Sequence, residues 1–369
     1  MKNISYLLFV LAVIALLPAV PAQAQVKPAA TTWISLFNGK DLSGWQTYLR
    51  PSEAAPDQTA IGLNKDPHGV FKAENGLIHV SGQDWGGLFT RQSYSNYHLR
   101  YQVKFGQKKW APRENVVADG GLLFHCSLPY DYGSKCWMRS VEMQIQETDI
   151  GDYHNVGAGI PQMPFSKAKD DEDEVDQYDP FAPLKPTKNR VFRSGNFESP
   201  AGQWTTGELI ARGADAVFIV NGFVVNRLYN LYRDDLQAQT TSGQLQFQSE
   251  GAEHFLRNIE LRPINFRQPG NIKMVAGKTE IQVSPKEPQT IEIINQGDAV
   301  ELVAVELLGK DLEQFTLKLP TFPLLVKKGE KLSVPVAAKT NSTAGSQVKI
   351  RLETVLGPVP DVTVNLKIK

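Results

Sequence analysis

The stretch DGGLLFHCSLPYDYGSKCWMRSVEMQIQETDIGDYH, residues 119–154, decides the fold, because it holds two β-strand patterns joined by a loop with a cysteine at each end. In the second pattern, residues 140–148, apolar and polar side chains alternate: Val141, Met143 and Ile145 against Glu142, Gln144 and Gln146. Successive side chains of a strand point to opposite faces, so one face is core and the other carries a carboxylate and two amides. Such an ordered polar face is typical of the floor of a polar-ligand site; an ordinary solvated strand face is the alternative.

The composition indicates a neutral globular chain. Its 369 residues suggest two domains and a processed end, at ~100–200 residues per domain. Lys plus Arg and Asp plus Glu both number 39, so there is no electrostatic reason to expect nucleic acid or an anionic membrane as a partner. A hydrophobic content of 41% supports a sizeable core.

The N-terminus has the pattern of a secretory signal peptide over residues 1–24. Lys2 provides the positive charge, residues 6–20 are apolar, and Ala22-Gln23-Ala24 fits the small-x-small cleavage rule. This apolar run is too short for a membrane span, which needs about 20 residues, and no second apolar run of that length exists. We therefore predict cleavage after Ala24 and a soluble protein that is periplasmic or secreted.

Short alternating segments and Gly/Asn turns predict an all-β sandwich. Residues 97–105 alternate cleanly, and residues 244–250 form a second ladder of Gln and Glu. Asn75-Gly76 and Asn221-Gly222 predict hairpin turns. Residues 160–190 are acidic and rich in proline and break the strand rhythm, which favours a long surface insertion. No helical periodicity follows the signal peptide.

The last hundred residues differ from the rest in composition. They contain no Trp, Tyr, Cys or His and are rich in Val, Leu, Ile, Lys, Pro and Thr. This composition is typical of a small β-sandwich built for packing. We predict a larger sandwich over residues 33–264 followed by a small immunoglobulin-like β-sandwich over residues 272–369.

Several polar residues of the larger domain could converge on one site. His125 and Glu142 lie on successive strands, and a His–carboxylate pair suits proton transfer near neutral pH, while the same atoms could also bind a divalent metal. The further candidates are polar residues of the two ladders and of the segment after residue 148, with one tryptophan for stacking on a sugar: Gln144, Gln146, Asp149, His154, Gln248, Glu250 and Trp45.

The chain has two cysteines, Cys126 and Cys136. In an oxidising compartment we expect a disulfide that closes the loop 127–135, and two free, partly buried thiols are the alternative. Two cysteines without CxxC spacing do not make a zinc site.

The segment LFNGKDLSGW, residues 36–45, resembles the opening motif of the 3-keto-disaccharide hydrolase domain family. Further matches follow in that family's order and cover residues 33–264: GLFT at 87–90, GLLF at 121–124, VEMQI at 141–145 and LQFQSEG at 245–251. The resemblance implies a concanavalin A-like jelly roll whose concave face holds the site. The chain departs from the family's common pattern at Asp119-Gly120-Gly121, where Asn-Ser-Gly is usual.

The resemblance also implies action on glycosides already oxidised at C3 of the sugar. A C3 ketone acidifies the C2 proton, so a general base can form an enolate that expels the C1 aglycone by β-elimination, after which water adds back. A metal, a histidine or an arginine would stabilise the enolate oxygen, which leaves a divalent metal cofactor open.

By that resemblance Glu142 is the base, because it matches the family's Glu-x-Gln strand. The residues that would orient substrate or metal are His125, Gln144, Gln248, Glu250 and Arg257. Two other functions remain open: a non-catalytic carbohydrate-binding protein, and an adhesion or scaffold protein whose working part is the C-terminal domain.

Overall fold

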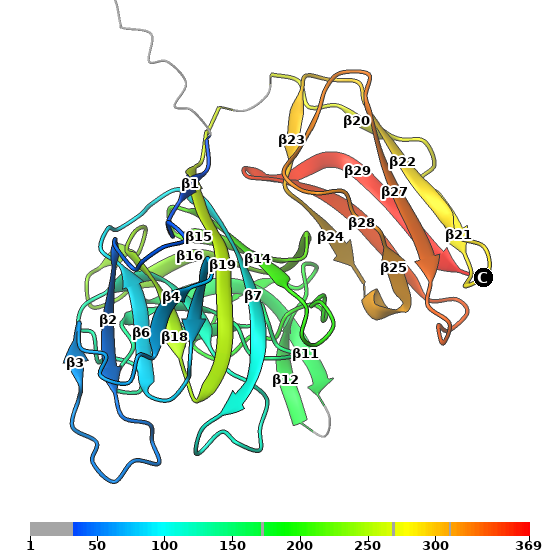
Figure 1. The fold of residues 1–369 in the computed structure, drawn as a ribbon. Coiled ribbons are helices and arrows are strands. Elements are labelled where there is room, and N and C mark those ends of the chain that lie inside the picture. The colour runs from blue at the N-terminus through cyan, green and yellow to red at the C-terminus, as the bar shows by residue number, and fades with distance from the viewer. Residues whose placement is uncertain (1–31, 171–172, 268–269, 310) are drawn as a thin grey trace, which may run out of the picture. The chain divides into compact units, whose positions relative to one another are not determined.

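Two antiparallel sheets pack against each other in the computed structural model, which describes residues 32–170, 173–267, 270–309 and 311–369 (Figure 1). Sheet I has the strand order β10 (Tyr153–Val156), β9 (Arg139–Gln144), β8 (Gly121–Ser127), β18 (Gln244–Ser249), β6 (Trp85–Thr90), β2 (Trp45–Arg50), β3 (Gly62–Leu63). Sheet II has the order β16 (Phe223–Arg233), β15 (Asp215–Val220), β14 (Thr205–Arg212), β7 (Tyr97–Lys109), β19 (Ala252–Pro263), β5 (Leu77–Val80), β4 (Phe71–Glu74), with β1 (Ile34–Ser35) beside β19. The predicted signal peptide lies outside the described residues.

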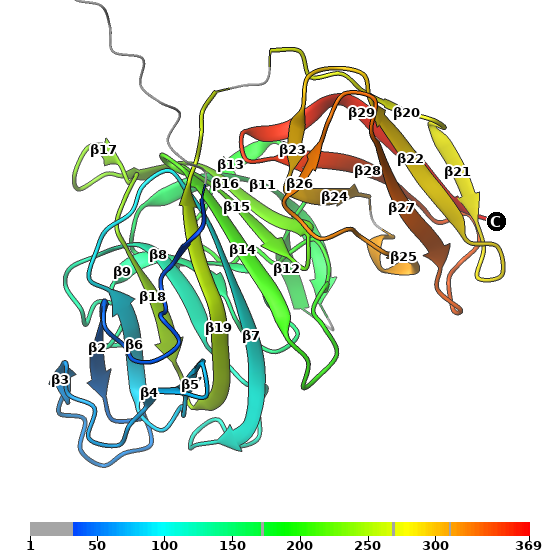
Figure 2. The same ribbon diagram turned by 45° about the horizontal axis from the view of Figure 1, so that its top comes forward.

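The apolar faces of the alternating strands build the core between the sheets. Val141 and Met143 of β9 and Phe247 of β18 are fully buried there, in the same cluster as Leu99 of β7. Figure 2 shows β9, β8, β18 and β6 as a layer behind β19, β7 and β14. Alternation therefore leaves Glu142 and its polar neighbours on the opposite side of sheet I, which we call the polar face.

Both hairpin turns predicted from Asn-Gly are confirmed. Asn75 and Gly76 join β4 to β5 with φ angles of 52° and 75°, and Asn221 and Gly222 join β15 to β16 with 47° and 82°. Two-residue hairpin loops of this type need positive φ at both positions, which Asn and Gly adopt at low cost.

One predicted strand boundary is wrong, and one segment contains strands that were not predicted. β9 ends at Gln144 because the chain turns back there: Gln144 N donates to Asp152 O at 3.0 Å, and Asp149 N donates to Gln146 O at 2.8 Å. The surface insertion predicted at 160–190 contains three strands that were not predicted from the sequence, β11 (Ile160–Asp170), β12 (Asp173–Tyr178) and β13 (Leu184–Pro186). Its acidic and proline-rich composition concealed Met163 and Phe165, which pack into the core.

The C-terminal part has a core of its own, which includes Val283, Leu302, Val364 and Leu366. Its strands are β20 (Met274–Ala276), β21 (Glu280–Val283), β22 (Gln289–Asn295), β23 (Val300–Leu302), β24 (Ala304–Leu308), β25 (Phe315–Leu317), β26 (Leu324–Val326), β27 (Lys331–Ala338), β28 (Gln347–Thr354) and β29 (Gly357–Ile368), and it also contains the 3₁₀ helix η1 (Leu312–Gln314). The short strand β17 (Ala238–Gln239) belongs to the preceding part of the chain, where it pairs with β16. An immunoglobulin-like identity for this part stays a prediction. Within the described residues, no helix has the length and apolarity to cross a membrane.

Candidate functional site

The polar face of sheet I brings the two predicted ladders together. β8 lies between β9 and β18, and Gly121 of β8 pairs with Gln144 of β9. A Cβ atom at Gly121 would collide with Glu142 Oε1 and with Gln248 Oε1, so these two oxygens share the space above the glycine. The two ladders therefore lie on the same face of one sheet, with the single strand β8 between them.

Three carboxylates converge at this place. Arg113 Nη1 lies 2.7 Å from Asp119 Oδ2, and Arg113 Nη2 donates to Glu250 Oε1, so one guanidinium bridges two of the acids. The third acid, Glu142, is only 6% exposed and is subject to the charges of both other carboxylates. Three buried negative charges near one bridging arginine favour retention of protons by the cluster.

Burial raises the pKa of each of these carboxyl groups. The pKa of Asp119 is raised to about 6, against the opposing effect of Arg113. Burial, with the charge of Asp119 added, raises the pKa of Glu250 to about 8. Burial raises the pKa of Glu142 well above its ordinary value, and the charges of Glu250 and Asp119 raise it further. Once ionised, a carboxylate of raised pKa is a stronger base than an ordinary one, which suits it to proton abstraction.

Buried polar atoms without hydrogen-bond partners lie on the same face. They are Trp85 Nε1, Gln246 Nε2, Gln248 Oε1 and His154 Nε2. The large majority of buried polar atoms in folded proteins are bonded, so a group of unbonded donors and acceptors indicates a place for a polar ligand. Gln246 is itself held, because its Oε1 accepts from Met138 N at 3.0 Å. Trp85 stacks on Trp137 with ring centroids 5.9 Å apart.

The histidine beside Glu142 is His154, whereas the sequence pointed to His125. β10 pairs with β9 so that His154 lies directly opposite Glu142. His125 lies in a bulge of β8 between Phe124 and Ser127, with a φ of 52°. A bulge redirects a side chain from strict alternation, and the ring of His125 packs 5.0 Å from that of Phe124, a core residue. The predicted pairing of His125 with Glu142 is therefore wrong.

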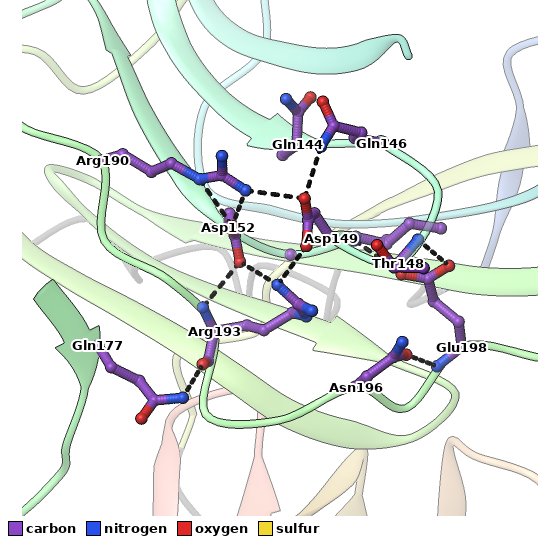
Figure 3. Close-up of polar contacts among 12 residues, drawn as sticks. Gln144, Gln146, Thr148, Asp149, Asp152, Gln177, Arg190, Arg193, Asn196 and Glu198 are labelled. Atoms are coloured by element: carbon purple, nitrogen blue, oxygen red, sulfur yellow. Dashed lines mark hydrogen bonds and ion pairs between the residues drawn. The ribbon is translucent and has the colours of Figure 1, made fainter. Parts of the chain in front are cut away.

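An arginine cluster holds the segment after β9, and we define it as Asp149, Asp152, Arg190 and Arg193 (Figure 3). Arg190 Nε and Nη2 donate to Asp152 Oδ2 at 2.8 and 2.5 Å, and Arg193 Nη1 donates to Asp152 Oδ1 at 3.0 Å. Asp149 lies 3.0 Å from Arg190 Nη2 and 2.9 Å from Arg193 Nη1. The positive charge of Arg190 also lowers the pKa of Glu142, so the cluster borders the site electrostatically.

Gln146 and Asp149, predicted to bind substrate, bond to each other instead. Gln146 Nε2 donates to Asp149 Oδ2 at 2.5 Å in the turn after β9 (Figure 3). Gln144 remains on the polar face, where its Oε1 accepts from Ile145 N at 3.0 Å. The amide ladder of β9 therefore ends at Gln144, and Gln146 has a structural role.

Two other predicted substrate contacts are wrong because their side chains lie elsewhere. Trp45 is 3% exposed in the core, and its Nε1 donates to Leu36 O at 2.8 Å. Arg257 lies on β19 of sheet II, donates from Nε to Gln102 Oε1 at 2.8 Å and stacks on Trp204 at 3.9 Å from the ring centroid. Both residues stabilise the fold.

The expected disulfide is absent, since Cys126 and Cys136 are both free and buried. They pack with Trp85, Phe89 and Trp137 in a small apolar cluster on sheet I. Burial raises the pKa of both thiols, that of Cys136 to about 12. The pair therefore behaves as apolar packing at the base of the site.

Arg113 and Arg190 are the residues that sequence reasoning missed. Arg113 follows β7 in a loop, and Arg190 follows β13, so neither belongs to an alternating strand pattern. No local spacing marks either residue. Their contacts with Asp119, Glu250 and Asp152 exist only once distant segments are brought together.

The three carboxylates of the site, Asp119, Glu142 and Glu250, are not arranged as ligands of a divalent metal ion. Arg113 already occupies Asp119 and Glu250, and no group of three or more His, Cys, Asp or Glu among the described residues is arranged to hold a metal ion. We therefore assign the chemistry below to side chains alone.

An open cavity of about 450 Å³ is lined in part by Thr148 and Glu198. Asp119, Glu142 and Glu250 do not line it. Glu198 already accepts from Thr148 N at 3.1 Å and from Ile150 N at 2.9 Å. Its acid is thus used structurally, and the polar face of sheet I remains the candidate site.

Comparison with known proteins gives one family match. Residues 32–262 match the family model described as a 3-keto-alpha-glucoside-1,2-lyase-like domain. No match was found among curated proteins.

Solved structures give a distant likeness. A candidate glycosyl hydrolase from Parabacteroides distasonis is 16% identical, with a TM-score of 0.41, over 64% of this chain and 96% of that one. A carbohydrate-binding module from Bacillus subtilis is 9% identical, with a TM-score of 0.30, over 59% and 95%. A laminarinase from Flavobacterium sp. is 12% identical, with a TM-score of 0.31, over 62% and 97%. At these values the likenesses add no argument about function.

Proposed function

The chain belongs to the 3-keto-alpha-glucoside-1,2-lyase-like domain family, and from this premise we propose that it is an exported enzyme that cleaves glycosides oxidised at C3 of the sugar. Glu142 is the general base in this proposal, and water replaces the aglycone at C1. Export rests on the signal-peptide pattern of residues 1–24.

One observation carries the enzyme proposal. A buried carboxylate, whose negative charge is not balanced by a bonded cation, lies beside polar atoms that have no hydrogen-bond partner. Glu142 lies near Asp119, Glu250 and the unbonded oxygen of Gln248. Its raised pKa suits a base that must remove a proton from carbon. The unbonded donors and acceptor suit the hydroxyl groups of a sugar.

The proposed reaction balances without an external reagent except water. Glu142 takes the C2 proton, and the electron pair of the C–H bond passes to the C3 oxygen to give the enolate. The C3 carbonyl then re-forms as the C1–O bond breaks, and the departing aglycone oxygen takes up a proton. Water adds across the C1–C2 double bond to give the 3-keto sugar, so the net change is hydrolysis.

The burial of the site limits access and helps the chemistry. Glu142 is 6% exposed, so little of its carboxyl group is in contact with solvent. Once a substrate is bound, exclusion of water strengthens the interaction of the developing enolate with nearby dipoles.

The test is aglycone release from a 3-keto glucoside with a chromogenic leaving group. We expect release by the wild type and a loss of about 10²–10⁴-fold in kcat for Glu142→Gln, the range typical of a removed general base. Parallel reactions with a chelator and with added divalent metal ions reveal any metal requirement.

Two results would count against the enzyme. One is the absence of release above background under every metal condition. The other is tight binding of unoxidised oligosaccharide with the same affinity in wild type and Glu142→Gln, which would favour a carbohydrate-binding module. The control Asp235→Asn alters an exposed acid far from Glu142 in sequence and should leave release unchanged.

A further inference from the structure

We propose that His154 donates a hydrogen bond from its imidazole to the C3 oxygen of the substrate while Glu142 removes the C2 proton. This inference rests on the proposed function and adds a second catalytic residue to it. The argument comes from strand pairing, from an unbonded ring nitrogen and from the engagement or strand position of the alternative donors.

Strand pairing sets His154 and Glu142 side by side. They are direct partners across β10 and β9, and both leave the core face: their neighbours Tyr153 and Met143, also paired, are fully buried in the core. Directly opposed residues of an antiparallel pair have Cβ atoms about 4.5–5.5 Å apart on the same face. C2 and the C3 carbonyl are bonded neighbours in the substrate, so a base and a donor at adjacent positions match the two reacting groups.

His154 has a ring nitrogen that the fold leaves without a partner. Its Nε2 is buried and makes no hydrogen bond among the described residues. Leaving a buried polar atom unbonded costs about 1–3 kcal/mol, so a substrate oxygen at this atom recovers a hydrogen bond that the free protein lacks.

The ring of His154 is neutral at neutral pH. Burial lowers its pKa to about 4, and the positive charge of Arg190 lowers it further, against Asp149. A neutral imidazole with its proton on Nε2 donates to an oxyanion and keeps that proton, as catalytic neutral histidines do. The C2 proton goes to Glu142, the electron pair goes to the C3 oxygen, and His154 changes no bond.

The other candidate donors are engaged or lie farther along the sheet. Trp85 Nε1 and Gln246 Nε2 are also unbonded, but they belong to β6 and β18, and β8 separates both strands from β9. Arg190 donates from Nε and Nη2 to Asp152, and its Nη2 also lies 3.0 Å from Asp149 Oδ2. Arg113 bridges Asp119 and Glu250. His125 has two unbonded nitrogens, yet its ring packs against Phe124 of the core.

The test compares three variants in two assays. His154→Leu removes the donor, His154→Gln keeps an N–H group, and His125→Asn is the matched control, because asparagine tolerates the positive φ at that position. One assay measures kcat and KM for aglycone release. The other follows exchange of the C2 proton of a 3-keto sugar in D₂O by NMR, which reports enolate formation alone.

We expect His154→Leu to lower kcat and the exchange rate by about 10²–10³-fold, the usual loss on removal of one oxyanion donor, with KM little changed. His154→Gln should lose less than His154→Leu in both assays, and His125→Asn should keep the wild-type rates. The unfolding midpoint of each variant checks that the fold survives, and His154→Gln carries the comparison if His154→Leu does not fold.

Wild-type rates in His154→Leu or His154→Gln, or a rise in KM alone, would overturn the role of His154 and leave the proposed function standing. Equal losses in His125→Asn would also overturn it, because the effect would then not be specific to the residue opposite Glu142. If the wild type neither releases aglycone nor exchanges the C2 proton, the proposed function fails and this inference with it.

Discussion

Two groups of acids, one in the turn after β9 and one on the polar face of sheet I, differ in how their charges are compensated. In the arginine cluster, Asp149 and Asp152 face two arginines, and both oxygens of Asp152 accept hydrogen bonds. In the carboxylate site, Asp119 and Glu250 share Arg113, whereas Glu142 beside them makes no ion pair among the described residues. The first group stabilises structure, and the second is available to a ligand.

The difference teaches that burial alone does not mark a functional acid. Asp152 and Glu142 are both nearly inaccessible to solvent. Burial raises the pKa of both carboxyl groups, and what separates them is the neighbouring charge: two arginines lower the pKa of Asp152, whereas Glu250 and Asp119 raise that of Glu142 further. The variants below test this distinction, from the largest expected effect to the smallest.

Asp152→Asn should destabilise the protein by about 3 kcal/mol, because it leaves two partly buried arginines with reduced compensation. Urea unfolding at pH 7 measures the change. The control is Asp235→Asn, whose acid is 58% exposed and pairs with Arg233 and Arg139, and it should cost less than about 1 kcal/mol. Equal effects in the two variants would contradict the structural role of the arginine cluster.

Gly121→Ala should lower kcat by about 10²-fold while the fold persists, because a methyl group displaces the ends of Glu142 and Gln248. Steady-state kinetics with the 3-keto substrate measures the loss. Gly87→Ala is the matched control on the same face, since its methyl group meets Gln246 and not the base; it should act mainly on KM. A wild-type kcat in Gly121→Ala would show that the two oxygens do not need this space.

Glu250→Gln should shift the acid limb of the kcat/KM profile to lower pH. The charge of Glu250 raises the pKa of Glu142, so its removal lets Glu142 ionise at a lower pH and act as a base there. The profile from pH 5 to 9 measures the shift. An unchanged limb would mean that the titrating base is not coupled to Glu250.

Stability should fall as pH rises from about 5 to about 8 in the wild type. Glu250 has a folded pKa of about 8 against an ordinary value of 4.5, so the folded chain holds protons that the unfolded chain releases across this window, and this contribution is lost as pH rises. Glu250→Gln should show a shallower decline in urea midpoint over the same range. A wild-type stability that rises through this window would contradict the raised pKa.

Much of the fold was predictable because it depends on local pattern. Alternation placed Val141, Met143 and Phe247 in the core, and Asn-Gly placed two hairpin turns. The strands at 160–190 were missed because proline and acidic residues masked a few buried side chains. The turn after Gln144 was missed because its cause, a backbone bond to Asp152, leaves no mark in the alternation.

The candidate site was predictable only in part. Glu142, Gln248 and Glu250 do lie together, as their ladders indicated. The partners that set their properties come from loops: Arg113 precedes β8, and Arg190 follows β13. No spacing rule reaches across such distances in the chain.

The sequence by itself determined the all-β class, the face on which Glu142 lies and the family to which the chain belongs, because these follow from period-two alternation, turn residues and ordered motifs. Only the tertiary structure decided which histidine lies beside Glu142. A bulge of one strand carries His125 toward the core, and the pairing of β10 with β9 brings His154 to the base. Register and long-range charge compensation are properties of assembled strands, and so the pKa values and free donors of the site exist only in the folded chain.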